Sequence, residues 1–119
     1  MSAPSPEVPS DAAYHALARA LLGGIEQQVD RWLQDDVVDI DSARTGGLLE
    51  LSFPNGSKIV VNTQPPLREI WLAARRGGFH YRHADGAWRD TKTGEEFFAT
   101  LSACASEQAG KALRFEPTA

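Results

Sequence analysis

The side chains of this sequence best suited to chemistry are six carboxylates gathered between residues 26 and 41. They are Glu26, Asp30, Asp35, Asp36, Asp39 and Asp41. Carboxylate oxygens are hard ligands, which suit iron, manganese, calcium or magnesium better than soft ions. The spacing does not fit an EF-hand loop, and no pair of histidines stands beside the acids to hold a transition metal tightly. The pattern therefore predicts a shallow, weak site for several cations.

The placement of these acids opposes helix stability. Glu26 and Asp30 stand four residues apart in a predicted helix, where like charges repel each other. Asp30, Asp35 and Asp36 crowd the C-terminus of that helix, where the macrodipole disfavours negative charge. Side chains that break a stability rule often mark a functional site. The alternative is a solvated acidic face with no special role, and composition alone does not decide between the two.

The formal charge of the 119-residue chain is −4 and is unevenly distributed. Residues 1–45 hold eight acidic and three basic side chains, whereas residues 46–119 hold eight acidic and nine basic ones. This balance disfavours nucleic acid as the main partner. No apolar stretch approaches the roughly 20 residues of a membrane helix, and the sequence begins with neither a signal-peptide core nor an arginine-rich transit segment. We therefore expect a cytoplasmic protein that has no membrane partner.

The motifs of the chain include none that is typical of nucleophilic catalysis. Cys104 is the single cysteine, so it forms no internal disulfide and builds no thiolate metal site by itself. His80 and His83 lie on or beside a predicted hairpin, without a serine or cysteine motif. We name no catalytic residue, and we expect Cys104 to be a small buried side chain.

Two helices are predicted, one at each end of a single domain spanning residues 10–119, after a disordered tail at residues 1–9. Ser10 is a good N-cap for a first helix that ends near Gln34. Its buried face is formed by apolar residues that recur every three or four positions. They are Tyr14, Leu17, Leu21, Ile25, Val29 and Trp32. The second helix should begin with a capping box, in which Glu96 reaches back to the Thr93 backbone, and end at Gly110.

Between the helices the apolar residues alternate, which predicts a run of antiparallel strands. The expected strands span residues 38–43, 48–53, 57–64, 79–82 and 87–90, and Asp39 and Asp41 would share one side of the first. Residues 67–74 fit a strand or a helix, and the neighbouring hairpins favour a strand. Asn55 and Gly56 predict a tight hairpin turn. Leu113 and Phe115 should fold back against the helices.

This order of elements predicts an α+β fold in which two helices pack on one face of an antiparallel sheet. The other face must then meet solvent or a partner. Asn62 and Gln64 share a side of one strand and are expected on that open face. Alternation alone does not place Trp71, because Ile70 and Leu72 are equally good core residues on the opposite side.

The stretch from Asn55 to Tyr81, NGSKIVVNTQPPLREIWLAARRGGFHY, strongly resembles the central signature of the frataxin family. The resemblance extends to the helix around His15, the Ile40-Asp41 strand, Trp88 and the final helix, and it favours the prokaryotic form. It implies an α-β-α sandwich, iron binding, and a role in iron–sulfur cluster assembly through contact with a cysteine desulfurase and its scaffold partner.

The resemblance also implies roles for individual side chains. The acidic ridge of the family occupies this helix and strand, so it assigns the six carboxylates to metal or partner binding. His15 matches a family position near the helix start and could add a nitrogen ligand. Gln27, Arg31 and Ala43 stand where more acidic members have carboxylates, which puts the iron capacity in question.

For the open sheet face, the family keeps an outward tryptophan at the position of Trp71. Together with Asn62 and Gln64, this exposed indole would make a protein-binding hot spot.

The leading hypothesis is an iron-binding regulator of iron–sulfur cluster assembly, which acts by protein contact and delivers or senses iron. One alternative is ferroxidase-type oxidation and storage of iron at the acidic ridge. Another is a metal-independent interaction module that uses its acidic face to meet basic surfaces.

Overall fold

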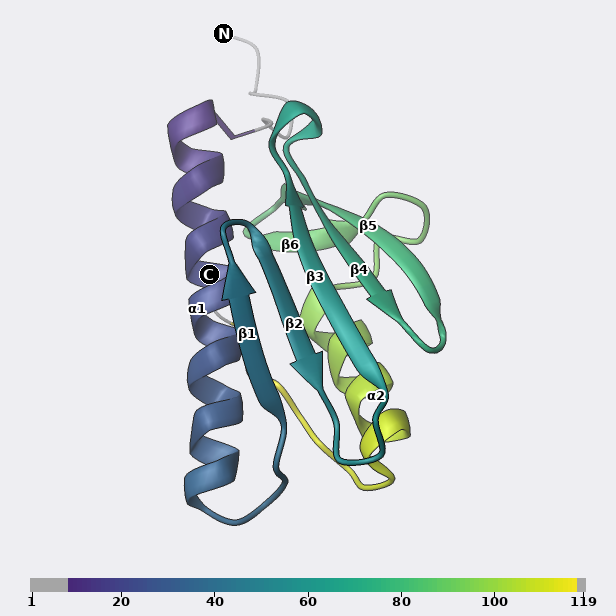
Figure 1. Ribbon diagram of the computed structural model, residues 1–119. Helices are drawn as coiled ribbons and strands as arrows, with labels where there is room; N and C mark the ends of the chain where they lie inside the picture. Colours follow the sequence, from purple (N-terminus) through teal and green to yellow (C-terminus); the bar gives the residue numbers. More distant parts are fainter. Residues whose placement is uncertain (1–8, 118–119) are drawn as a thin grey trace, which may run out of the picture.

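A computed structural model describes residues 9–117, and the predicted tail therefore lies outside the described residues except for Pro9. The elements, in chain order, are α1 (Asp11–Gln34), β1 (Asp41–Thr45), β2 (Leu48–Ser52), β3 (Lys58–Gln64), the 3-10 turn η1 (Pro65–Leu67), β4 (Glu69–Ala74), β5 (Gly77–Ala84), β6 (Ala87–Asp90) and α2 (Phe97–Ala109). Each strand pairs antiparallel with the next one along the chain, so the sheet order is β1-β2-β3-β4-β5-β6 (Figure 1). Among the described residues, no helix combines the length and apolar character needed to cross a membrane.

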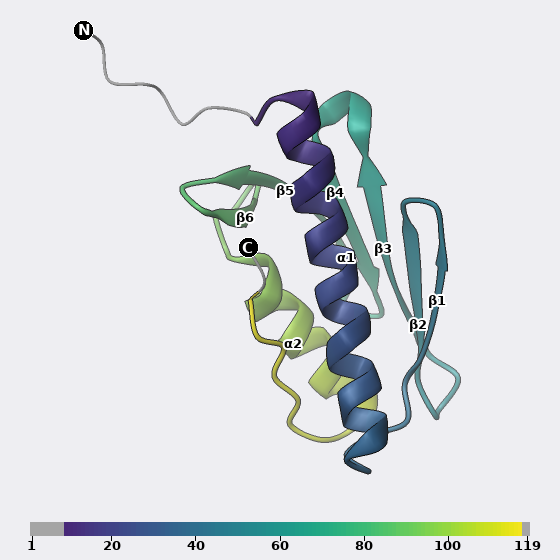
Figure 2. The ribbon, with the colours of Figure 1, turned by 90° about the vertical axis from the view of Figure 1, so that its left-hand side faces the viewer.

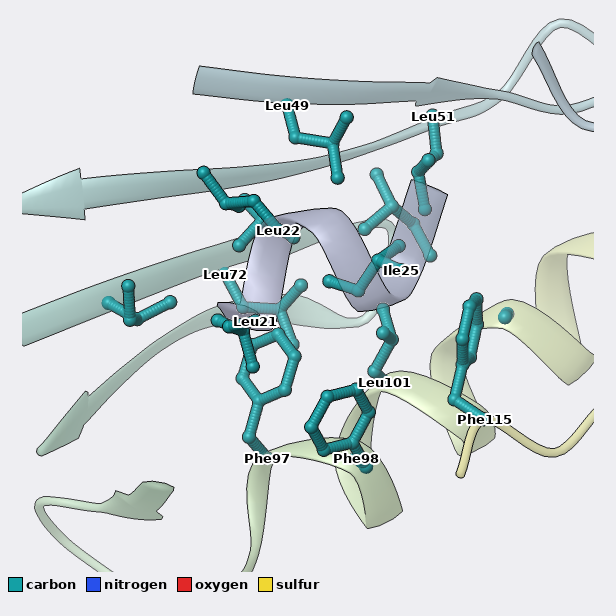
Figure 3. Close-up of a cluster of buried hydrophobic side chains, with 14 of the residues drawn as sticks. Leu21, Leu22, Ile25, Leu49, Leu51, Leu72, Phe97, Phe98, Leu101 and Phe115 are labelled. Carbon is teal, nitrogen blue, oxygen red and sulfur yellow. The ribbon is translucent and has the colours of Figure 1, made fainter. Parts of the chain in front are cut away.

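The two helices lie on the same face of the sheet, and the other face carries no element of the described chain (Figures 1 and 2). Apolar side chains from both helices and from the inner sheet face fill the space between the layers, as Figure 3 shows for Leu21, Ile25, Leu49 and Leu101. The α+β architecture predicted from the order of elements is confirmed.

Helix α1 begins and ends through identifiable hydrogen bonds. The Ser10 hydroxyl accepts a hydrogen bond from the Ala13 amide, which confirms the predicted cap. At the other end, Asp36 adopts a left-handed conformation with φ of 57°. The amides of Asp36 and Val37 donate to the carbonyls of Leu33 and Trp32, which is the pattern of a Schellman motif. The helix thus ends where predicted. Asp36 takes the left-handed position of the motif, which is most often occupied by glycine.

The first strand begins later than predicted. Residues 38–40 form no strand, because they carry the chain from the end of α1 across to the sheet, and pairing starts at Asp41. Ile40 anchors this link in the core. Asp39 consequently lies in the link, and it does not share a strand face with Asp41.

The expected strand at residues 67–74 is confirmed from Glu69 onward. Its first residues instead complete η1, after which Arg68 takes a left-handed conformation with φ of 51°. Strand β5 is longer than predicted, because the turn at residues 75–76 lets β4 and β5 pair as far as Ala74 and Gly77.

The predicted capping box at Thr93 is wrong. Residues 91–93 form a turn, and a bridge between Arg89 and Glu96 keeps the chain extended up to the helix. Glu96 is therefore the N-cap of α2, and its carboxylate accepts hydrogen bonds from the amides of Phe98 and Ala99. The Gly110 stop is confirmed, with φ of 69°.

The chain after α2 folds back between the two helices, as predicted for Leu113 and Phe115, which are both buried. The Ser102 hydroxyl accepts a hydrogen bond from the Phe115 amide. The Gln28 side chain of α1 bonds both backbone groups of Glu116, with its oxygen accepting at 2.6 Å and its nitrogen donating at 3.0 Å. This segment therefore joins α1 to α2.

Candidate functional site

The six predicted metal-binding carboxylates occupy one end of the molecule, where α1 leads into β1, and we call this region the acidic end (Figure 1). Glu26 and Asp30 belong to the last part of α1, Asp35 and Asp36 terminate it, Asp39 lies in the link, and Asp41 opens β1. All of them are exposed except Glu26, which is partly buried. These positions, spread over 16 residues of sequence, thus lie along the last turns of α1, the link and the start of β1.

Glu26 differs from the other five because it is already bound. Its Oε1 atom lies 2.8 Å from Nη1 of Arg44, and both side chains are only 30% exposed. Arg44 reaches α1 because it alternates with Asp41 and Ala43 along β1 and faces the helix layer opposite buried Leu49. A cation that uses Glu26 must therefore displace a guanidinium.

The other five carboxylates of the acidic end form no hydrogen bond or ion pair with any residue that the structure describes. Within residues 9–117, no three acidic, histidine or cysteine side chains stand close enough to enclose a metal ion together. A cation at this end would therefore bind one or two carboxylates and complete its coordination with water. Such coordination is typical of an open, weak site, and the weak site expected from the sequence stays a prediction.

Basic groups also lie within the acidic end. Arg31 stands on the last turn of α1, next to Asp30 in sequence. The ammonium group of Lys111 donates a hydrogen bond to the Val37 carbonyl in the link. Together with Arg44, these cations lower the negative potential that the acids produce.

His15 lies apart from the acidic end. It stands near the start of α1, 15 residues before Asp30, which corresponds to about 22 Å along the helix axis. Its nearest acidic group is Asp11, with 3.9 Å between His15 Nε2 and Asp11 Oδ2. The structure thus does not bring His15 together with the six carboxylates.

The predicted partner-binding residues do lie together on the open face. Asn62 pairs directly with Trp71 across β3 and β4, and Gln64 pairs with Glu69. The residues that flank Trp71, Ile70 and Leu72, are both buried in the core. The indole therefore points outward, although neighbouring side chains leave it only partly exposed.

Three side chains that sequence reasoning did not single out surround this indole. Glu69 accepts a hydrogen bond from Trp71 Nε1 at 2.9 Å. The ring of His80 stacks on the indole, with 4.2 Å between centroids and 5° between planes. Arg82 completes the group through a 2.9 Å ion pair with Glu69. The turn at residues 75–76 fixes the register of β4 against β5, and this register makes these residues neighbours. The alternation of side chains along both strands was the sequence pattern that could have predicted it.

A shallow hollow of about 230 Å³ opens beside Trp71 on the same face. Leu48, Val60 and Ala73 supply apolar walls, while Asn62 and His80 supply polar ones. Leu48 is 37% exposed, so part of the apolar wall is accessible to a partner. The open face thus offers an apolar depression with an aromatic wall.

Cys104 is buried on α2, as predicted. Burial is the main cause that raises the pKa of its thiol above the usual value. The thiol is therefore protonated at neutral pH and poorly suited to act as a nucleophile or metal ligand.

Comparison with known proteins gives a consistent result. A family model described as a frataxin-like domain matches residues 7–111. The iron-sulfur cluster assembly protein CyaY of Burkholderia mallei is 53% identical over 106 residues, covering 89% of this chain and 97% of that protein. The same figures hold for CyaY of Burkholderia pseudomallei.

Solved structures show the same likeness. Frataxin from Psychromonas ingrahamii superposes with a TM-score of 0.79 at 33% identity, covering 92% of this chain and all of the other. Trimeric frataxin from Saccharomyces cerevisiae, described as complexed with ferrous ion, has a TM-score of 0.64 at 22% identity and covers 92% of this chain and 94% of its own. At that identity the yeast protein shows the shared fold alone.

Proposed function

The chain belongs to the frataxin-like family, and from this membership we propose that it works in iron–sulfur cluster assembly in the cytoplasm. Relatives that share about half of their residues with it over nearly their full length carry this role in their name. The proposal has two parts, one for the acidic end and one for the open sheet face.

At the acidic end, the protein binds iron as cargo, weakly and at more than one position. The observation that carries this part is the set of five exposed carboxylates without partners among the described residues. Unpaired carboxylates leave both oxygens available to a hard cation such as iron(II). Other divalent cations of similar preference would compete for the same oxygens.

At the open face, Asn62, Gln64 and Trp71 contact a cysteine desulfurase and its scaffold protein. Partly exposed aromatic side chains beside amides are typical of binding hot spots. The protein then acts as a regulator, or as an iron donor or sensor, through these contacts. It needs no catalytic residue for this role.

A metal-independent role of the acidic end is the second candidate. It is favoured by the Glu26–Arg44 ion pair and by the lack of any three-donor cluster within residues 9–117. In this case the acids would meet a basic surface of the partner directly.

Binding measured with and without iron separates these candidates. The purified chain is titrated into a desulfurase–scaffold complex under argon, with iron(II) or with a chelator. If the protein acts through iron, its affinity for the complex or the desulfurase rate should differ between iron(II) and chelator. If the acids only contact a basic surface of the partner, the two binding curves should be the same. Oxygen consumption by iron(II) at substoichiometric protein would instead indicate oxidation of iron at the acidic end.

The location of iron is tested by nuclear magnetic resonance. Paramagnetic iron(II) or manganese(II) should first broaden amide signals from the end of α1 and the start of β1. Early broadening around His80 and His83 would contradict the assignment.

A further inference from the structure

Glu69 is a buried acid on the open face of the sheet. It alternates with the core residue Ile70, so it points away from the helices, and yet its side chain is only 7% exposed. Placing a carboxylate out of water costs free energy unless hydrogen bonds replace the lost hydration. An acid serving only solubility would remain more accessible, as Glu50 does on the same face, where 34% of its side chain is exposed.

Both oxygens of this carboxylate are used. Oε1 accepts the hydrogen bond from the Trp71 indole, and Oε2 accepts from Nε of Arg82, each at 2.9 Å. Arg82 pairs directly with Glu69 across β4 and β5, and its side chain is 59% exposed. The arginine therefore holds the carboxylate in one orientation, in which Oε1 faces the indole nitrogen.

The ring of Trp71 is thereby fixed on two sides. Glu69 accepts the hydrogen bond from the nitrogen edge of the indole. His80 pairs directly with Trp71 across β4 and β5, and its ring stacks on the face of the indole. A hydrogen bond to an ionised acceptor is stronger and more directional than one between neutral groups. An exposed tryptophan without these contacts would move between rotamers.

The geometry points to Glu69 as a positioning residue, which holds the Trp71 indole in one orientation so that a partner protein meets a preformed hollow. This inference rests on the proposed function, in which the open face docks the assembly machinery. The indole forms one wall of the hollow, and Leu48, Val60 and Ala73 form others. The occupant that fits is an aliphatic side chain of the partner, because the walls are mostly apolar. Fixing the wall in advance lowers the entropy cost of binding.

The first test observes the ring itself. In the wild-type chain, the indole NH of Trp71 should give a signal that is protected from exchange with solvent. Glu69→Ala should abolish that protection, while Glu69→Gln, whose amide oxygen can still accept the hydrogen bond, should retain part of it. Equal protection in all three chains would overturn the inference.

The second test measures affinity for the purified desulfurase–scaffold complex. Glu69→Ala should weaken binding about tenfold, the equivalent of one charge-assisted hydrogen bond, and Glu69→Gln should weaken it less. Glu50→Gln is the matched control, because it removes an acid from the same face that pairs with Lys58 and does not touch Trp71. This control should bind within about twofold of the wild type, as expected for a partly exposed ion pair.

A double-mutant cycle separates positioning from a direct contact or a general loss of structure. Trp71→Phe keeps an aromatic ring but has no NH to donate, so adding Glu69→Ala to it should cause little further loss. An equal loss in both backgrounds would overturn the inference. If the wild-type chain does not bind the complex at all, the proposed function fails and the docking role of Glu69 fails with it. If the wild type binds and Glu69→Ala binds equally well, only the role of Glu69 is refuted.

Discussion

Arg44 limits what the acidic end can bind, because its guanidinium occupies Glu26. We expect Arg44→Gln to tighten binding of manganese(II) by about two- to fivefold, the equivalent of one partly exposed ion pair. Titration followed by paramagnetic broadening of the α1 amides measures the change. Arg19→Gln removes the same charge from an exposed position on α1, and it should have a smaller effect. If the two variants bind equally, net charge alone sets the affinity.

Trp71 contributes more to stability than its outward direction suggests. The sequence predicts a loss below about 1 kcal/mol for Trp71→Ala, since cutting an exposed side chain opens no cavity. In the structure, Trp71 also stacks on His80 and donates a hydrogen bond to Glu69. Its removal would leave Glu69 without one donor, so the expected loss in the free energy of unfolding is about 1–3 kcal/mol. Urea denaturation of Trp71→Ala and Trp71→Phe measures it, and the Phe variant should lose less. Equal stability of both variants and the wild type would mean that neither contact stabilises the fold.

The direction and burial of a side chain were predictable from sequence where they depend only on the periodicity of its own helix or strand. The outward direction of Asn62 and the burial of Cys104 follow from alternation and from the helical period. The roles of Glu69 and Arg44 did not follow, because each depends on a cross-element contact. The first needs the register of β4 with β5, and the second needs the side of β1 that faces α1.

At the scale of elements, the end of α1 carries avoidable strain. Asp36 holds a left-handed conformation and adds a negative charge at the helix C-terminus. Asp36→Gly should relieve both penalties and raise stability by about 1 kcal/mol. Thermal denaturation at low salt measures the gain. Asp39→Asn removes a charge from the neighbouring link and should change stability little, so an equal gain there would assign the effect to charge alone.

The start of α2 gives the opposite case. Glu96→Ala should destabilise the protein by about 1 kcal/mol, because two amides lose their acceptor. Thr93→Ala should cost less, since its hydroxyl accepts only from the Glu95 amide in an exposed turn. The midpoints of urea denaturation compare the stability of the two variants. A larger loss of stability for Thr93→Ala would support the capping box predicted from sequence.

Element types were thus predicted better than element ends. Glycine, proline and alternation locate the strands, and Ser10 locates the start of α1. The start of α2 depends on the bridge between Arg89 and Glu96, and the late start of β1 depends on the distance from helix layer to sheet. Both are tertiary constraints that local sequence patterns do not contain.

For the whole molecule, the segment after α2 completes the core. The ring of Phe115 lies 4.6 Å from that of Trp32 on α1, and Phe115 is 2% exposed. Phe115→Ala should cost about 3–5 kcal/mol, as expected for a large aromatic side chain removed from a core. Calorimetry measures the loss. Arg114→Ala, at an exposed neighbouring position, should stay within about 0.5 kcal/mol of the wild type, and similar losses in both would indicate that the segment acts only through its backbone.

The hydrogen bonds between Gln28 and Glu116 also affect how the protein folds during its synthesis. During synthesis α1 emerges well before Glu116, and every strand between them pairs with its immediate neighbour in the chain. The hairpins can therefore form and cover the sheet-facing side of α1 first, whereas the side that carries Trp32 stays uncovered until residues 113–116 emerge. A nascent chain stalled before residue 113 should expose Trp32 and its neighbours to chaperones, and the emergence of residues 113–116 should cover them.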